Sequence, residues 1–200
     1  MSGKFHEGVR IPTRIGEELF NERNKIRLRK VASGAHHTLA LTVEGKLYAW
    51  GDPESGKIGR MLNTRNKDKQ ALMIEKVGAK DAVDVWAGNH HSFYSNSKGK
   101  VYAWGLNNHG QLGIGHKENT SVPTWVRGLE GVTMIAGGEH HTIAVTVEGK
   151  VYCWGRNDEG QCGNGDLYSK HKQKRAMEEY ERLMQLEAEE ARKKEAAALE

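Results

Sequence analysis

The amino-acid sequence predicts an all-β fold, a partial β-propeller of three four-stranded blades, followed by a charged α-helix at the C-terminus. Three observations lead to this prediction. One segment recurs three times in register, each copy has the pattern of short strands joined by tight turns, and residues 169–200 differ from the rest in composition. All 24 glycines and all five tryptophans of the 200 residues precede this tail, which also lacks proline. The chain therefore combines a repeat array with a tail of a different kind.

The repeat is visible when residues 31–51, 85–105 and 135–155 are aligned. Each segment contains a Gly-x-His-His motif near its start and ends in Trp-Gly. The glycines of the first motif lie at positions 34, 88 and 138, which are 54 and 50 residues apart, and the Trp-Gly pairs keep the same intervals. Three copies with one order of motifs indicate a single structural unit that recurs along the chain.

Within each unit the sequence predicts short strands in a fixed order. Residues 38–42 are rich in apolar and β-branched residues, Glu44-Gly45 predicts a hairpin turn, and residues 46–50 alternate in character. A Gly-x-x-Gly element follows each Trp-Gly, and a fourth strand is predicted at 123–126 in the second unit and at 71–74 in the first. Four short strands in each unit are typical of a propeller blade.

The third unit has no counterpart of the fourth strand, because the sequence becomes charged after Gly163. Residues 11–15, Ile-Pro-Thr-Arg-Ile, resemble that strand and lie in the N-terminal segment 1–30. We therefore expect them to complete the last blade. Closed propellers contain about 4–8 blades, so three blades leave the wall incomplete. Further chain, self-association or a partner is expected to cover the open blade faces.

The repeats occupy residues 31–168, and the tail after them predicts a helix. Residues 169–195 consist largely of Ala, Glu, Lys, Arg, Leu and Met, without a helix-breaking residue. A basic run at 170–175 is typical of a nuclear-localisation or docking segment, and a solvated helix is the alternative. Residues 196–200, Ala-Ala-Ala-Leu-Glu, resemble a cloning scar.

Composition excludes several classes of protein. The net charge of +4 is spread along the chain, and no recognition-helix or zinc-finger pattern occurs, which argues against sequence-specific DNA binding. The only cysteines, Cys153 and Cys162, form no disulfide framework and predict free core thiols in a reducing compartment. Since no apolar run reaches the length of a membrane helix or a signal core, we expect a soluble intracellular protein without a membrane partner.

No pattern for covalent catalysis or metal binding stands out, so we do not expect an enzyme. The Gly-rich loops neither open a helix nor continue to Lys-Ser/Thr, which excludes a phosphate-binding P-loop. The His-His pairs lie 50 or more residues apart without clustered Asp or Cys, which argues against a metal site. We expect His37, His91 and His141 to be structural, each a buried imidazole bonded to the backbone.

Three motifs, Gly-x-x-His-(Thr/Ser), Gly-Lys-Val-Tyr-x-Trp-Gly and Gly-Gln-Leu-Gly, recur in this order. Through them, residues 9–168 resemble the regulator of chromosome condensation family. The stretches 58–60 and 136–142 are most similar to central blades of its nuclear exchange factor, a seven-bladed propeller that acts on the small GTPase Ran. The resemblance implies that one propeller face binds the GTPase and stabilises its nucleotide-free state, with no cofactor and no covalent step.

The resemblance directs attention to the two residues before the repeat histidine in each unit. Each pair follows a blade-start glycine, so all three pairs are expected to project from one face and to bind the partner. The predicted residues are Ala35, His36, Asn89, His90, Glu139 and His140. The family has an aspartate, essential for exchange, before the repeat histidine in one such loop, where the best alignment places His36. Either the alignment is shifted by one blade, or exchange activity is weakened or lost.

Three functional hypotheses follow. The first is a nuclear exchange factor for a Ran-like GTPase, or a fragment of one, with chromatin or a nucleosome as a further partner and a cytoplasmic pool in addition to the nuclear one. The second is a repeat scaffold that binds a protein or chromatin without affecting nucleotide. The third is a self-assembling partial propeller in which two copies share blades.

Overall fold

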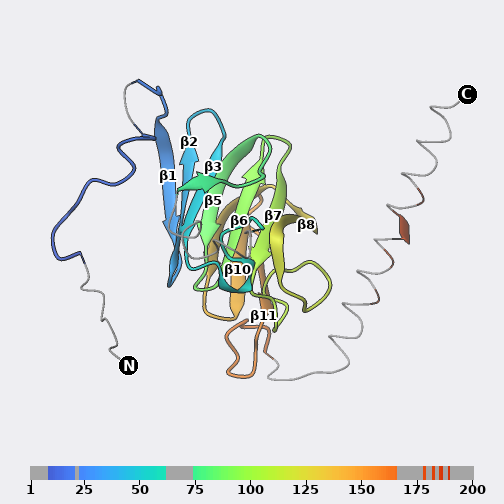
Figure 1. Cartoon of the computed structure of the whole chain (residues 1–200). Coiled ribbons are helices and arrows are strands. Elements are labelled where there is room, and N and C mark those ends of the chain that lie inside the picture. The colour runs from blue at the N-terminus through green and yellow to red at the C-terminus, as the bar shows by residue number, and fades with distance from the viewer. Residues whose placement is uncertain are drawn as a thin grey trace, which may run out of the picture.

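The computed structural model describes residues 9–20, 23–61 and 74–165, together with positions 178, 182, 185, 186 and 189. In this part of the chain the strands form three antiparallel sheets, which lie one after another in chain order (Figure 1). The first blade consists of β1 (Leu28–Ser33), β2 (His37–Thr42), β3 (Leu47–Gly51) and β4 (Glu75–Lys76). The second consists of β5 (Ala82–Ala87), β6 (His91–Asn96), β7 (Lys100–Gly105) and β8 (Thr120–Glu130). The third consists of β9 (Val132–Gly137), β10 (His141–Thr146) and β11 (Val151–Gly155). These sheets confirm the predicted all-β class and are consistent with a partial propeller, although the third has three strands instead of the predicted four.

The Trp-Gly pair ends the third strand of each blade for a steric reason. Gly51 has φ +113°, and a Cβ atom at this position would lie 2.4 Å from the carbonyl oxygen of His36. Gly105 and Gly155 repeat this close approach to the carbonyl oxygens of His90 and His140. Only glycine combines this conformation with this space, so the pair fixes where the third strand meets the loop before the second.

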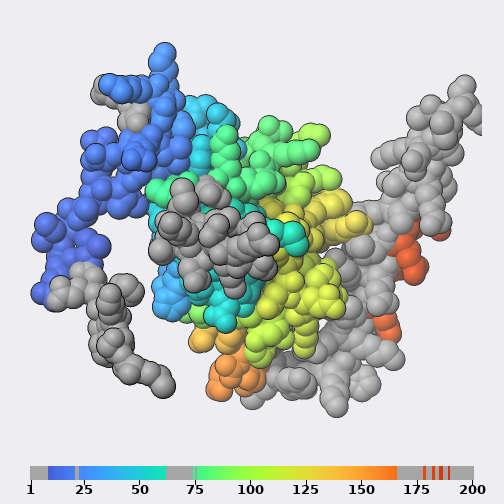
Figure 2. All heavy atoms as spheres, in the orientation of Figure 1, coloured from blue at the N-terminus to red at the C-terminus, as the bar shows by residue number. Residues whose placement is uncertain are grey.

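The blades pack face to face, and two apolar clusters fill the spaces between them. Leu39 and Leu41 of the first blade pack with Val85 and Trp104 of the second. Phe93 and Leu112 of the second blade belong to the cluster that includes residues of the third. Burial of these apolar faces is the main force that joins the three sheets. Figure 2 shows the described blades as one continuous body in space-filling view.

The second strand of the middle blade is buried on both faces, whereas that of the third blade is buried on one face. β6, in the middle blade, is buried along His91–Ser95 because sheets cover both of its faces. β10 has the same place in the third blade, yet its residues alternate between half-buried and buried. One face of β10 is therefore covered and the other is not.

Three parts of the sequence-based prediction need correction or stay open. The third blade has three strands among the described residues, and residues 11–15 form no strand, so the expected completion of this blade by the N-terminal segment is wrong. The first blade's fourth strand is β4 at 75–76 instead of 71–74, of which 71–73 lie outside the described residues. The helix of 169–195 also lies outside them except for five positions, which are helical.

Candidate functional site

In each blade a loop joins the first strand to the second, and the three loops lie at the same end of the strands. The backbone N–H of Ala35 donates to the carbonyl oxygen of Asn89 at 3.0 Å. The backbone N–H of Asn89 donates to the carbonyl oxygen of Gly138, also at 3.0 Å. These bonds connect the loops from blade to blade. The structure thus places all six predicted partner-binding residues in one row, with Ala35, His36, Asn89 and Glu139 exposed. Their role in binding stays a prediction.

Imidazole rings dominate this row. The rings of His36 and His90 have centroids 6.4 Å apart, and those of His140 and His109 are 4.8 Å apart. We call His36, His90, His140 and His109 the histidine row. His109 was missed by sequence reasoning, because it lies in the loop after the second Trp-Gly and has no histidine counterpart in the other repeats. The only sequence feature that could have pointed to His109 is its position directly before the Gly-x-x-Gly element.

Two members of the histidine row are held in the neutral state. Partial burial, and next the ammonium group of Lys57, lower the pKa of His90. Partial burial and the neighbouring His140 lower the pKa of His109. Both shifts move the titration further below pH 7, so these rings are neutral under physiological conditions. The row therefore presents imidazole hydrogen-bonding groups without a fixed charge at these two positions.

A buried ion pair lies close to the histidine row. Lys57 Nζ lies 2.6 Å from Asp52 Oδ2, and the lysine side chain is only 4% exposed, whereas that of Asp52 is 35% exposed. Partial burial raises the pKa of Asp52, but hydrogen bonds from Lys57 and the Glu54 N–H outweigh this and lower it. Glutamine, as Gln111 and Gln161, has the position of Lys57 in the other repeats. The sequence alignment contained this difference, but its importance depends on burial.

Replacing Asp52 by alanine is expected to lower the free energy of unfolding by about 1–3 kcal/mol, because the buried ammonium loses its partner. Adding Lys57→Gln to this variant is expected to restore most of the loss, since glutamine fits the same position in the other repeats. Urea unfolding of the two variants and the parent protein measures both effects. A double variant as unstable as Asp52→Ala would contradict the interpretation.

The repeat histidines join neighbouring blades. His37 Nε2 lies 2.8 Å from Ser92 Oγ, and His91 Nε2 lies 2.9 Å from Thr142 Oγ1. Both hydroxyls donate their proton to a backbone carbonyl, so each Nε2 carries the hydrogen and donates. The prediction of buried structural histidines is correct for His37 and His91. The predicted backbone partner is wrong, because a hydroxyl of the next blade accepts the bond.

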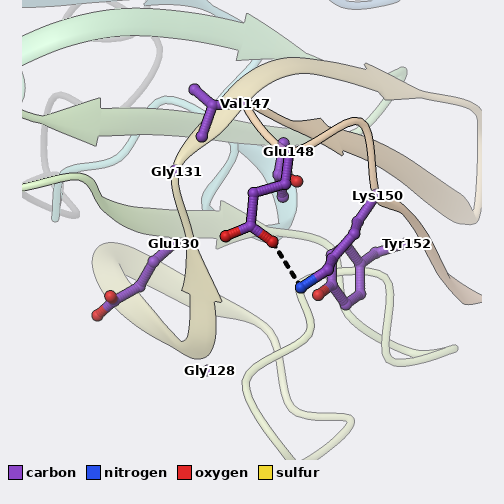
Figure 3. Close-up of a pocket in the computed structure, with 8 residues that line it drawn as sticks. Gly128, Glu130, Gly131, Val147, Glu148, Lys150 and Tyr152 are labelled. Atoms are coloured by element: carbon purple, nitrogen blue, oxygen red, sulfur yellow. Dashed lines mark ion pairs between the residues drawn. The ribbon is translucent and has the colours of Figure 1, made fainter.

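A pocket is the other feature of the described residues, and it lies apart from the histidine row. A pocket of about 410 Å³ lies between the end of β8, Gly131 and the turn 147–150 (Figure 3), at the ends of the strands opposite the histidine row. An exposed pair, Glu148 and Lys150, is its main charged feature. No group of three or more His, Cys, Asp or Glu suited to a metal is present in the described ranges.

The two cysteines are unpaired thiols. They are half-buried, not fully buried as expected, because they lie in the third blade, one face of which is uncovered. Burial, and next a hydrogen bond with Cys162, raise the pKa of Cys153 to about 12, so this thiol stays protonated. Within the described part of the chain, no helix has both the length and the apolar character needed to cross a membrane.

Comparison with known proteins places this geometry in context. Residues 2–198 match the family model described as the RCC1-like domain. Protein pim1 of Schizosaccharomyces pombe is 40% identical over 107 residues, which cover 51% of this chain and 20% of pim1. The human E3 ubiquitin-protein ligase HERC2 is 39% identical over 110 residues, which cover 54% of this chain and 2% of HERC2.

Solved structures show the same blade arrangement. Prp20p from Saccharomyces cerevisiae, a structure reported with its binding to Gsp1p and histones, has a TM-score of 0.62 and 28% identity. The match covers 67% of this chain and 32% of Prp20p. Human WBSCR16 has a TM-score of 0.64 and 26% identity over 74% of this chain and 38% of that protein. The chain thus spans about a third of these structures.

Proposed function

The chain belongs to the RCC1-like domain family, and from this membership we propose that it is a guanine-nucleotide exchange factor, or part of one, for a Ran-like small GTPase. The observation that carries the proposal is the linked row of loops with the six predicted residues on one edge of the blades. The reported binding of Prp20p to Gsp1p and histones supports a GTPase, and chromatin as a second partner, for a protein that matches it over two thirds of this chain. A nuclear location follows from the same premise.

The mechanism requires binding alone. The three linked loops bind the GTPase in its nucleotide-free state. The exchange factor lowers the affinity of the GTPase for nucleotide by some factor, and bound nucleotide lowers the affinity of the GTPase for the exchange factor by the same factor. No bond is formed or broken in the exchange factor. The neutral rings of His90 and His109 offer hydrogen-bonding groups that do not repel a basic partner surface.

We expect the protein to accelerate release of fluorescent GDP from a Ran-like GTPase. Glu139→Lys is expected to reduce this stimulation about fivefold or more, since it reverses an exposed charge in the loops proposed to contact the GTPase. Glu148→Lys makes the same charge change at the opposite ends of the strands, and it should retain stimulation. No acceleration by the parent protein at micromolar concentration would reject exchange activity.

A second candidate function is a repeat scaffold that binds its partner without exchange. The match to HERC2, a ubiquitin ligase, favours it, because similar repeats occur in a protein of another class. His36, at the position where the resemblance implies an aspartate, is consistent with this alternative. A stable complex whose affinity does not change with GDP or GTP would support the scaffold over the exchange factor.

A further inference from the structure

The two junctions between blades use one and the same set of contacts. A histidine, a backbone carbonyl and a glycine of one blade meet a hydroxyl and a tryptophan of the next. We call this the interblade contact set. In the first junction it consists of His37, Lys57 and Gly59 with Ser92 and Trp104. In the second it consists of His91, Gln111 and Gly113 with Thr142 and Trp154.

The geometry of the set is conserved between the junctions. The carbonyl oxygen of Lys57 accepts from the Trp104 indole at 2.9 Å and from Ser92 Oγ at 3.1 Å. The carbonyl oxygen of Gln111 accepts from Trp154 and Thr142, both at 2.8 Å. The glycine lies against the indole, since a Cβ on Gly59 would be 2.7 Å from Trp104 Nε1 and one on Gly113 would be 2.9 Å from Trp154 Nε1. A side chain at this glycine position would displace the tryptophan.

Each outer blade carries one half of a third set. The third blade has the half with the histidine, the carbonyl and the glycine, and no atom lies within 4 Å of the position that a Cβ would take at its glycine. The first blade has the half with the hydroxyl and the tryptophan. The residues of the first half are His141, Gln161 and Gly163, and those of the second are Thr38 and Trp50. All five are half-buried or exposed, whereas Ser92, His91, Gln111 and Trp104 at equivalent positions are fully buried.

One valine beside each half is uncovered. Val31 in the first blade is 61% exposed, although the equivalent Val85 and Ile135 are at most 5% exposed. Val151 in the third blade is 67% exposed, although the equivalent Leu47 and Val101 are at most 1% exposed. Val31 and Val151 therefore expose positions that are interior in the middle blade. The rest of the first blade's outer face is covered, since Ala40 and Tyr48 are buried and the ring of Phe20 packs edge-on against Tyr48 with centroids 5.6 Å apart.

We propose that the third blade of one copy of this chain binds the first blade of a second copy through a third interblade contact set. Trp50 Nε1 and Thr38 Oγ1 of the second copy donate to the carbonyl oxygen of Gln161, and His141 Nε2 donates to Thr38 Oγ1. The Trp50 indole packs on Gly163. The occupant is a second copy because both halves come from this chain. They also repeat the residue types of the second junction, with Thr and Trp on one side and His, Gln and Gly on the other.

The association is head-to-tail, because two different faces meet. In the second junction the Asn89 N–H donates to a carbonyl oxygen in the loop of the third blade. In the proposed junction the Glu139 N–H donates in the same way to the loop of the first blade of the second copy, so the linked loops continue from one copy to the next. Each copy thus adds its own loops to the surface proposed to bind a partner. This proposal does not depend on exchange activity, because it concerns the opposite blade faces and not the loop edge.

Sedimentation velocity of the full chain, from low to high micromolar concentration, tests the association. We expect the mass to rise from one chain to at least two. Trp50→Ala and Gly163→Asn should each raise the concentration needed for association roughly tenfold or more. Asn is suitable because it tolerates the φ of +62° at Gly163, and the open space there leaves the folded chain undisturbed.

An equimolar mixture of the two variants provides the sharpest test. Each variant retains the face that the other has lost, so the mixture is expected to form two-chain species at concentrations where either variant alone is monomeric. Val122→Ala, an exposed apolar truncation on the middle blade, is the control and should associate like the parent.

A parent protein that stays monomeric at every concentration would overturn the proposal. Association unchanged in both variants, or a mixture that stays monomeric while the parent associates, would also reject the head-to-tail contact.

Discussion

Replacing Trp104 by alanine is expected to lower the free energy of unfolding by about 3–5 kcal/mol. The Trp104 side chain is fully buried in the cluster between the first two blades, where Gly59 leaves space for the indole. Its N–H donates to the carbonyl oxygen of Lys57. The substitution thus leaves a large cavity and a buried carbonyl with one donor fewer. Denaturant unfolding followed by circular dichroism measures the loss.

Trp50→Ala is the matched control for this prediction. Trp50 has the same repeat position, but it is half-buried and belongs to neither apolar cluster. At low protein concentration, where chains are monomeric, its truncation should cost clearly less than that of Trp104. Equal losses in the two variants would show that the tryptophan stabilises its own blade and not the junction between blades.

Acidification from pH 7 to pH 4 is expected to destabilise the protein by several kcal/mol. Burial, and next Lys57, lower the pKa of His37 to about 4, and burial, and next His37, lower that of His91 to about 3. Unfolded histidines have a pKa of about 6.5. Between these values the unfolded chain binds more protons than the folded one, so stability falls as the pH falls. Each histidine contributes on the order of 3 kcal/mol across this window.

The low pKa of each histidine is explained by the surroundings of its two ring nitrogens. Nε2–H already donates to Ser92 or Thr142, and the buried Nδ1 of each ring has no hydrogen-bond partner. A proton on Nδ1 would create a buried charge without an acceptor. The stabilising contribution is therefore complete above pH 6.5 and is lost as the pH falls toward the folded-state pKa values.

His91→Gln tests this assignment. Glutamine keeps a hydrogen-bond donor but does not titrate, so the variant should show a flatter dependence of stability on pH between 7 and 4, whatever its stability at pH 7. His116→Gln, in an exposed loop, is the control and should keep the dependence of the parent. A His91→Gln profile parallel to that of the parent would show that other groups cause the acid sensitivity.

Much of the fold was predictable because the features behind it are local. Glycine at the Trp-Gly pair, the Glu44-Gly45 turn and the run 123–126 each determine the backbone within a few residues, and β3, β7, β8 and β11 appear where these features predicted them. The prediction failed at residues 11–15. Their sequence suits a fourth strand, but a strand requires a neighbour with which to pair, and sequence pattern does not supply one.

The candidate site was predictable in part for the same reason. The shared Gly-x-His-His motif identified the three loops, and the structure brings them into one row. His109 and the pair of Lys57 and Asp52 were missed, since their proximity to these loops arises from chain segments that the motif does not include. No local pattern distinguishes a buried lysine from an exposed one.

By itself the sequence determined the repeating unit, the order of its strands and the positions of its turns. The tertiary structure decided which residues at equivalent repeat positions are buried and which are exposed. His91 and His141 share one motif, as do Val85 and Val31, yet one member of each pair is buried and the other is not. The reason is that burial depends on the presence of a neighbouring blade, which a residue's own sequence context does not encode.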